Sequence, residues 1–331
     1  MIIGENNVLL KIEPKDIDID GKCIIPYGIK VIGKAAFRGN IELTSVVLPN
    51  SIIDIQRNAF EDCANLKSIN IPNGLKSISF GTFFDCESLE SVRLPNSIEE
   101  INDFAFAKCN QLKEVRFPKC LKTIGEDSFS QCRSLTSIIL PPGLISIAEG
   151  AFAHCTSMVS VVNLSQSLAE IKQAAFMGCT KLRGINLPDS IMQCGESIFL
   201  NCKSLVNVNI PKNIFTIPRG MFERCENLSF VEIPNGVSAI ACKAFANCTS
   251  LKKLIISNSV TSIHNDTFQG CVSLVDVQVP AHSYSKELFV DSPNATVTQI
   301  HSAKNLFEEA MNSKMSDVAN IENIIIDESE R

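Results

Sequence analysis

Residues 98–118 read I-E-E-I-N-D-F-A-F-A-K-C-N-Q-L-K-E-V-R-F-P, and the same pattern returns along most of the chain. Its general form is I-x-x-I-x-x-x-A-F-x-x-C-x-x-L-x-x-V-x-L-P. The phenylalanine recurs eleven times, at steps of 23 residues apart from one step of 24: Phe37, Phe60, Phe83, Phe106, Phe129, Phe152, Phe176, Phe199, Phe222, Phe245 and Phe268. A unit copied at a fixed period predicts a solenoid, in which each copy packs on its neighbours, rather than a globular enzyme domain.

Each repeat is expected to contain two short extended segments and one short turn. Residues 112–118 alternate inward apolar and outward polar side chains, which is typical of a half-buried strand. The proline ends that strand because it has no backbone N–H to continue a ladder. Residues 98–101 predict a second extended piece, and residues 103–109 suit about one turn of α- or 3-10 helix. The predicted fold class is therefore an α/β solenoid of about eleven 23-residue repeats.

A single repeat cannot bury its apolar positions alone, so the stack needs a cap at each end. At about 4.8 Å per strand, eleven coils predict a rod about 50 Å long. We expect residues 1–27 to form an N-terminal capping hairpin from two apolar runs, at 8–12 and 23–26, and residues 28–280 to form the repeat array. Residues 281–313 are expected to form a C-terminal cap with a short amphipathic helix at 302–313. Residues 314–331 are expected to form an acidic, flexible tail.

The 24-residue step is the one irregularity in the spacing of the phenylalanines. It lies between Phe152 and Phe176, where one residue is inserted near 162–165 and the proline is lost. An extra residue in one of two paired strands is left unpaired and bends the strand. We therefore expect a bulge or bend of the strand face in the middle of the array.

The repeat resembles the BspA-like leucine-rich repeat, a 23-residue class that also occurs in treponemal leucine-rich proteins. The L-x-x-V-x-L-P strand, the I-x-x-I segment and the A-F-x-x-C turn carry the resemblance over residues 28–280. It implies a right-handed solenoid with short parallel strands on one face and short 3-10 or α turns on the other. It also implies binding rather than catalysis, because proteins of this family are known as adhesins, surface proteins and interaction modules.

Composition argues against nucleic-acid binding and against a membrane span. The net charge is −6 with an isoelectric point near 5.4, and no stripe of Lys or Arg is present to neutralise phosphates. No apolar run reaches the roughly 18 residues that a membrane helix needs. The first residues are acidic and lack the apolar core of a secretory signal. We expect a cytoplasmic monomer whose partner is a protein.

Ten of the fourteen cysteines follow the repeated phenylalanine by three residues: Cys63, Cys86, Cys109, Cys132, Cys155, Cys179, Cys202, Cys225, Cys248 and Cys271. Stacked at about 5 Å, neighbouring cysteines satisfy the distance for a disulfide. Their side chains nevertheless point the same way, and free cysteine is among the most often buried residues. We interpret the series as a column of inert thiols. The 23-residue spacing supplies no C-x-x-C pair, so no metal and no other cofactor is predicted.

The sequence contains no catalytic constellation. The histidines are His154, His264, His282 and His301. His154 adjoins Cys155, but consecutive side chains point in different directions and Cys155 belongs to the buried series. No nucleophile elbow, phosphate-binding loop or metalloprotease motif occurs. We predict that the chain is not an enzyme.

Function is then expected on the outward side chains of the strand face. Most outward positions are small or polar, but some carry exposed apolar residues beside the inserted residue and beside charges, and such clusters mark interfaces. Phe230 is expected two rungs from Ile139 and Val162. The predicted partner-binding residues are Ile139, Val162, Phe230, Glu232, Lys253, Ile255, Arg93 and Arg116. For each apolar residue, the ordinary β-propensity of a sheet face is the alternative explanation.

Two functional hypotheses are consistent with these features. The first is a non-enzymatic protein–protein interaction module that acts in a cytosol. The tail at 314–331 resembles the acidic C-terminal signals of effectors injected by intracellular bacteria, which implies translocation into a host cytosol. The alternative is a cell-surface adhesin, exported by an unconventional route, that binds a matrix protein or another cell.

Overall fold

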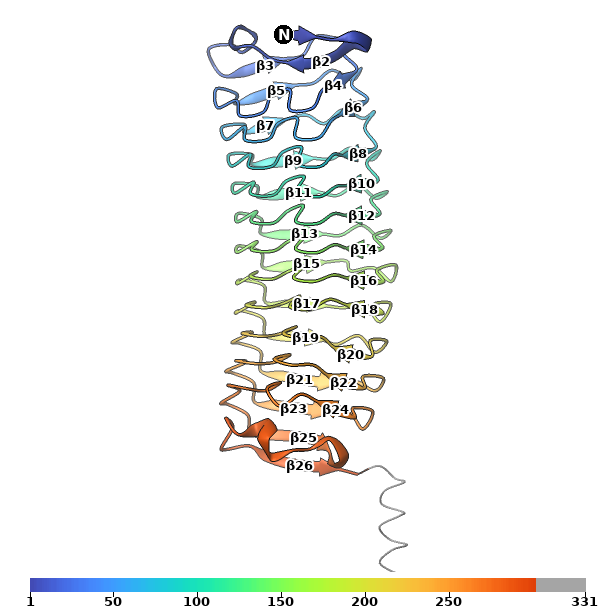
Figure 1. The fold of residues 1–331 in the computed structure, drawn as a ribbon, viewed down its shortest axis with the longest axis vertical. Helices are drawn as coiled ribbons and strands as arrows, with labels where there is room; N and C mark the ends of the chain where they lie inside the picture. The colour runs from blue at the N-terminus through green and yellow to red at the C-terminus, as the bar shows by residue number, and fades with distance from the viewer. Residues whose placement is uncertain (302–331) are drawn as a thin grey trace, which may run out of the picture.

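The chain folds into a straight rod in which each turn lies on the one before it (Figure 1). The computed structural model describes residues 1–301. Every repeat contributes two short strands, so two columns of strands run along the rod. The rod has about thirteen turns, because a further turn forms at each end of the eleven-repeat array.

The first column is built from the L-x-x-V-x-L-P segments, and its strands pair in parallel. Residues one repeat apart lie opposite each other, as Val92 does to Val115. The middle residue of each strand is typically buried, because alternate side chains point to opposite faces. The members are β3 (Lys22–Ile24), β5 (Ser45–Val47), β7 (Ser68–Ile69), β9 (Ser91–Arg93), β11 (Glu114–Arg116), β13 (Ser137–Ile139), β15 (Ser160–Val162), β17 (Gly184–Asn186), β19 (Asn207–Asn209), β21 (Phe230–Ile233), β23 (Lys253–Ile256), β25 (Asp276–Pro280) and β26 (Thr296–Ile300).

The second column is built from the I-x-x-I segments, which confirms the second extended piece of the repeat. Its strands are two residues long in the array, and Ile101 lies opposite Ile78 and Ile124. The members are β2 (Val8–Lys11), β4 (Val31–Ile32), β6 (Asp54–Ile55), β8 (Ser77–Ile78), β10 (Glu100–Ile101), β12 (Thr123–Ile124), β14 (Ser146–Ile147), β16 (Glu170–Ile171), β18 (Gln193–Cys194), β20 (Thr216–Ile217), β22 (Ala239–Ile240) and β24 (Ser262–Ile263).

The phenylalanine segment is a series of turns and not an α-helix, so the expected α/β class is corrected. In residues 1–301 the helices are four short 3-10 segments, η1 (Glu5–Asn7), η2 (Pro14–Asp16), η3 (Ala281–Ser283) and η4 (Lys286–Phe289). The N–H groups of Phe104, Phe106 and Lys108 donate to carbonyls of the next turn of the rod at 2.7–2.8 Å. In an α-helix each of those N–H groups would instead donate to the carbonyl four residues earlier in the same segment. Phe104 and Lys108 also have positive φ, which ends a right-handed helix.

The eleven repeated phenylalanines form one continuous buried stack. Neighbouring ring centroids lie 4.6–5.8 Å apart, and the ring planes are within 24° of parallel. Each ring is at most 1% exposed. Because the repeated rings contact one another only between neighbouring turns, the stability of the stack is approximately a sum of contacts between neighbouring turns.

The ten repeated cysteines form a second buried column beside the phenylalanines. Each thiol donates to the backbone carbonyl of the phenylalanine in the preceding turn, at 3.1–3.3 Å. All fourteen cysteines are unpaired. Burial raises the pKa of the Cys63 and Cys179 thiols to about 12, which keeps them protonated and able to donate.

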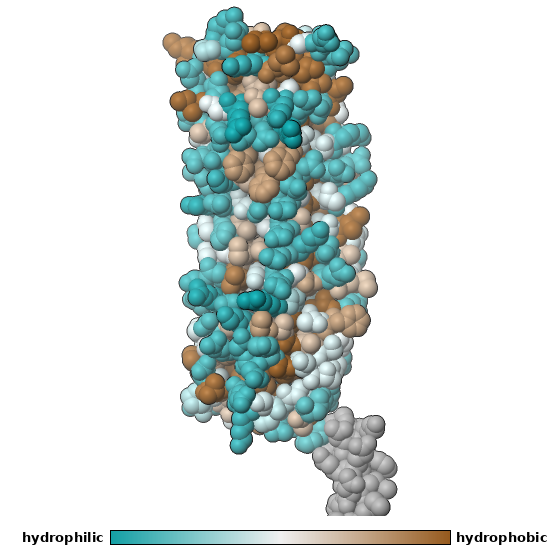
Figure 2. Space-filling view, in the orientation of Figure 1, coloured by the Kyte–Doolittle hydropathy of each residue, from teal (hydrophilic) through white to brown (hydrophobic). Residues whose placement is uncertain are grey.

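The N-terminal end is closed by a short antiparallel pair, β1 (Ile2–Ile3) with β2. The apolar runs at 8–12 and 23–26 do not pair with each other as expected. Instead β2 pairs with β4 and β3 pairs with β5, because both runs carry the inward side chains of the two columns. Ile2, Ile3 and Leu10 remain exposed, and apolar side chains gather at this end of the rod (Figure 2).

The C-terminal end carries a further turn that the repeat pattern did not reveal. Phe289 in η4 stacks on Phe268 at 5.5 Å, and Ser292 occupies the place of the cysteine and donates to the carbonyl of Cys271 at 2.7 Å. β26 then pairs with β25 over five residues. The spacing from Phe268 to Phe289 is shorter than 23 residues, which conceals the repeat in the sequence. The helix expected at 302–313 and the tail at 314–331 lie outside the described residues.

The inserted residue disturbs the first column in the middle of the rod. β15 and β17 share a single aligned pair, Ser160 with Gly184, whereas β13 and β15 share three. Asn163, directly after β15, has a φ of 62°. The extra residue is therefore absorbed as an interruption of the strand pairing.

Candidate protein-binding face

The outward side chains of the first column form two rows along the rod. Each three-residue strand turns its middle side chain into the core and its two outer side chains to solvent. The first row runs Glu114, Ser137, Ser160, Gly184, Asn207, Phe230 and Lys253, and the second row runs Arg116, Ile139, Val162, Asn186, Asn209, Glu232 and Ile255.

The eight residues predicted from the sequence form four cross-strand pairs in three groups. Two strands, β17 and β19, separate the middle group from the last one. Phe230 is therefore three strands from Val162 rather than the expected two, because two complete repeats lie between their strands. The pairs are Arg93 with Arg116, Ile139 with Val162, Phe230 with Lys253, and Glu232 with Ile255.

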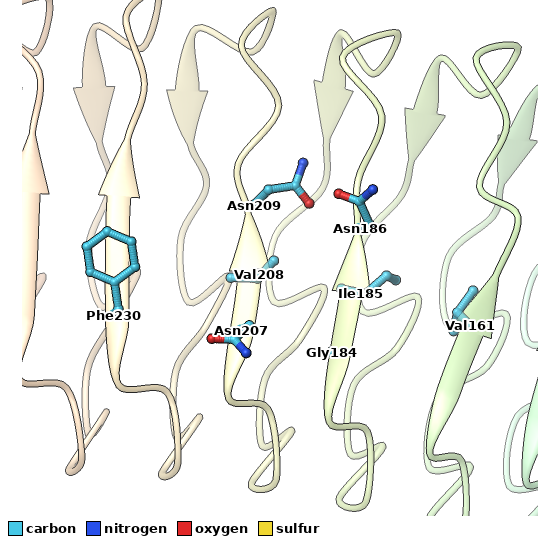
Figure 3. A pocket seen from close by; sticks show the side chains of 8 residues that line it. All are labelled: Val161, Gly184, Ile185, Asn186, Asn207, Val208, Asn209 and Phe230. Atoms are coloured by element: carbon cyan, nitrogen blue, oxygen red, sulfur yellow. The ribbon is translucent and has the colours of Figure 1, made fainter.

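A shallow hollow of about 530 Å³ occupies the gap between the middle and last groups (Figure 3). Its floor is formed by the small outward residues of β17 and β19, and Phe230 forms one wall. Phe230 is 40% exposed and Ile139, beyond the opposite wall, is 61% exposed. The lining residues are Val161, Gly184, Ile185, Asn186, Asn207, Val208, Asn209 and Phe230.

The hollow exists because its floor carries no large side chains. The pairing of neighbouring strands is also interrupted at both edges of the hollow. Gly184 has no side chain, and its strand shares only one aligned pair with β15. Val161 in the middle of β15 is consequently half-buried, whereas the equivalent Ile138 is buried. At the other edge, β19 and β21 belong to separate sheets.

The three asparagines of the floor differ in their hydrogen bonding. The Asn209 side chain accepts from the Leu187 N–H at 2.8 Å and donates to the Leu187 carbonyl, so it extends the strand pairing. The side chains of Asn186 and Asn207 make no hydrogen bond within residues 1–301. These two amides can therefore donate to and accept from the backbone of a partner.

Charged residues flank the hollow on both sides. On the N-terminal side, the Arg116 Nε donates to Glu114 at 2.7 Å, and both residues line a second hollow of about 420 Å³ with Ile139. On the C-terminal side, Lys253 forms an ion pair with Asp276 at 2.9 Å. All of these ion pairs are solvent-exposed, so they contribute little to stability and remain available to a partner.

The histidine–cysteine neighbours noted in the sequence do not come together as a catalytic pair. The thiol of Cys155 is buried while His154 is exposed, so the two do not form a nucleophile–base pair. Over residues 1–301, no group of three or more His, Cys, Asp and Glu side chains is placed to hold a metal ion. Within the same residues, no helix has the length and apolarity needed to cross a membrane.

Sequence reasoning missed the floor of the hollow. Alternation along the strands identifies Gly184, Asn186 and Asn207 as outward residues. It does not show that their side chains are small enough to leave a hollow on the face. The available signal is the run of Gly and Asn at four successive outward positions, directly after the inserted residue.

Two stacked columns of short parallel strands, joined by turns and filled with repeated apolar side chains, define a leucine-rich-repeat solenoid. A model of the BspA type leucine-rich repeat region, with six copies of the repeat, matches residues 21–133, 99–228, 159–275 and 216–329. The chain belongs to this family. A comparison with curated proteins finds no significant match.

Two solved structures of bacterial leucine-rich-repeat proteins share the fold, and a third is similar to a lower degree. A leucine-rich repeat protein from Bacteroides ovatus is 24% identical, with a TM-score of 0.50 over 91% of this chain and 97% of that chain. One from Eubacterium ventriosum is 17% identical, with a TM-score of 0.53 over 85% of this chain and 84% of that chain. A leucine-rich cell surface protein from Faecalibacterium prausnitzii is 23% identical, with a TM-score of 0.49 over 89% of this chain and 96% of that chain.

Proposed function

We propose that the chain is a non-enzymatic interaction module that binds a protein partner on the first strand column, between Val162 and Phe230. The observation that carries this proposal is the hollow of about 530 Å³, whose polar floor lies between exposed apolar side chains. Apolar anchors in a recess, surrounded by polar groups, are the usual composition of a protein-binding hot spot.

The scaffold supports binding because it presents these side chains in fixed positions. Ile185 and Val231, in the middle of their strands, are buried, and the strands rest on the continuous phenylalanine stack. A face that is already ordered loses little conformational entropy when a partner binds. The free amides of Asn186 and Asn207 would give the interface its directional hydrogen bonds.

We also propose the compartment in which the chain acts. A cytosol, including a host cytosol reached by an effector, is supported by the fourteen unpaired cysteines, because thiols persist in reducing surroundings. The alternative of a surface adhesin would use the same face. Protease shaving of intact cells separates the two: release of fragments from intact cells supports the adhesin, and protection supports the cytosol.

Affinity capture with matched variants tests the binding face. The double variant Ile139→Ala/Phe230→Ala removes both exposed anchors, and the control Val272→Ala removes an exposed apolar side chain outside the strand face. We expect the double variant to lose the captured partner and the control to retain it, with melting temperatures of all three proteins within a few degrees. Equal capture by the double variant would dismiss this face.

A further inference from the structure

The second strand column carries an apolar stripe of its own. One outward position precedes each of its strands, and in four successive repeats that position is apolar: Ile145, Ala169, Met192 and Phe215. The N–H of Ala169 donates to the carbonyl of Ile145 at 2.9 Å, and the N–H of Met192 donates to that of Ala169 at 3.0 Å, so these three residues are stacked directly. Phe215 lies on the next turn beyond a break in the pairing, because β18 and β20 belong to separate sheets. Met192 is 63% exposed and Phe215 is 73% exposed.

The stripe is confined to the middle of the rod. In the three preceding repeats the same position holds Lys76, Glu99 and Lys122, in which both lysines form ion pairs with Glu99 at 3.5 and 2.8 Å. In the two following repeats it holds Ser238 and Thr261. Single exposed apolar residues are ordinary on a protein surface, but three exposed ones and the half-buried Ala169 on four successive turns form a patch of the kind that marks an interface.

Acidic side chains border the stripe on the side of the phenylalanine turns. Met192 and Phe215 line a hollow of about 750 Å³ together with Glu149, Glu170 and Glu196. None of these three carboxylates forms an ion pair within residues 1–301. Lys172 and Arg219 line the same hollow, so carboxylates exceed cations there by one (three minus two).

The acidic border continues beyond the hollow. Glu126 and Asp103 occupy the position equivalent to Glu149 in the two preceding repeats, and neither forms an ion pair within the described part of the chain. Beside the four stripe residues themselves this position holds Glu149, Gln173, Glu196 and Arg219, and Glu170 adds a third carboxylate. Charge complementarity therefore favours a basic partner.

We propose that this stripe binds an amphipathic, basic helix of a partner protein, on a face separate from that of the proposed function. The four stripe positions span about 14 Å at about 4.8 Å per turn of the rod. The apolar residues of a helix at i, i+4, i+7 and i+11 span about 16 Å, at 1.5 Å per residue. A helix along the rod thus places one apolar side chain near each turn, and basic residues on its flank reach Glu149, Glu170 and Glu196.

Charge excludes two other occupants. The whole chain carries a net charge of −6, which opposes association with a second copy of itself. Residues 302–331 contain seven Asp and Glu against three Lys and Arg, so this segment is acidic as well. A basic segment from another protein is the occupant that fits.

Titration of two synthetic peptides against the full chain tests the proposal. One peptide carries leucine at i, i+4, i+7 and i+11 with lysine on the flanking positions, and the other replaces each lysine by glutamate. We expect the lysine peptide to bind and the glutamate peptide not to bind. The Met192→Ser/Phe215→Ser and Glu170→Gln/Glu196→Gln variants should each weaken binding by at least about tenfold.

Phe230→Ala is the matched control, because it changes an exposed aromatic residue on the first column. It should leave binding of the lysine peptide unchanged, and far-UV circular dichroism should show that every variant is folded. Equal affinity for both peptides, unchanged affinity of the Met192→Ser/Phe215→Ser variant, or a loss caused by Phe230→Ala alone would overturn the proposal.

Discussion

Replacement of Phe176 by alanine removes one ring from the middle of the phenylalanine stack. Phe176 is fully buried, and its ring lies 5.5 Å from that of Phe152 and 5.8 Å from that of Phe199. Truncation of a buried phenylalanine to alanine typically costs about 3–5 kcal/mol, because apolar burial is lost and a cavity remains. We expect Phe176→Ala to lower the free energy of unfolding by that amount.

The coupling between two such substitutions is the sharper test. Phe176 and Phe199 are in contact, and an aromatic pair contributes about 0.5–1.5 kcal/mol beyond area burial. The double variant of these neighbours should depart from additivity by that amount. Phe60 and Phe245 are about 40 Å apart at the strand spacing. Their double variant should be additive to within about 0.5 kcal/mol.

Urea unfolding followed by far-UV circular dichroism measures these free energies, because the chain has no tryptophan and only two tyrosines to report by fluorescence. The fraction folded in each of the single and double variants gives both couplings. Additive losses at Phe176 and Phe199, or strong coupling between Phe60 and Phe245, would refute a core built from contacts between neighbouring turns.

Three further predictions concern other parts of the rod. Gly195→Ala should cost about 1–3 kcal/mol by thermal unfolding, because the added Cβ would clash with the backbone nitrogen of Gln173, whereas Gly143→Ala, whose nearest contact is 3.8 Å, should cost little. Thiol labelling of the native protein should modify exposed Cys120 first and leave the ten column thiols unreacted until unfolding. A hydrogen bond from Lys122, with a smaller effect of Lys76, lowers the pKa of Glu99. The stability that this interaction contributes is present above the ordinary carboxyl pKa and is lost as the pH falls through the lowered pKa of Glu99. Glu99→Gln should therefore reduce the melting temperature slightly at neutral pH and leave it unchanged at low pH.

The interior of the rod could be predicted from the sequence because equivalent positions of every repeat have the same environment. A residue type that returns at a fixed offset, such as the phenylalanine or the cysteine, must occupy equivalent buried sites in every turn. The class of the turn could not be predicted, because the N–H groups around Phe106 bond to the next turn, and that choice depends on the stack rather than on one repeat. The last turn could not be recognised in the sequence, because Phe289 follows Phe268 at less than the 23-residue spacing and Ser292 stands at the position of the cysteine.

The candidate sites could be predicted only in part. Alternation along the strands identified the outward positions of Ile139 and Phe230 correctly, since that pattern is local. The hollow between them depends on the absence of a side chain at Gly184 and on a register change caused by the insertion, and neither is visible as a motif. The stripe at Met192 and Phe215 required comparison of the outward positions in the second extended segment as well as the first.

Photo-crosslinking is the sharpest test of whether the first strand column binds the partner at the hollow. A photoreactive phenylalanine analogue at Asn207 lies on the floor of the hollow, and the same analogue at Arg224, exposed on a phenylalanine turn, is the control. We expect the captured partner to form an adduct from position 207 and none from position 224. An adduct from position 224 with none from position 207 would contradict it.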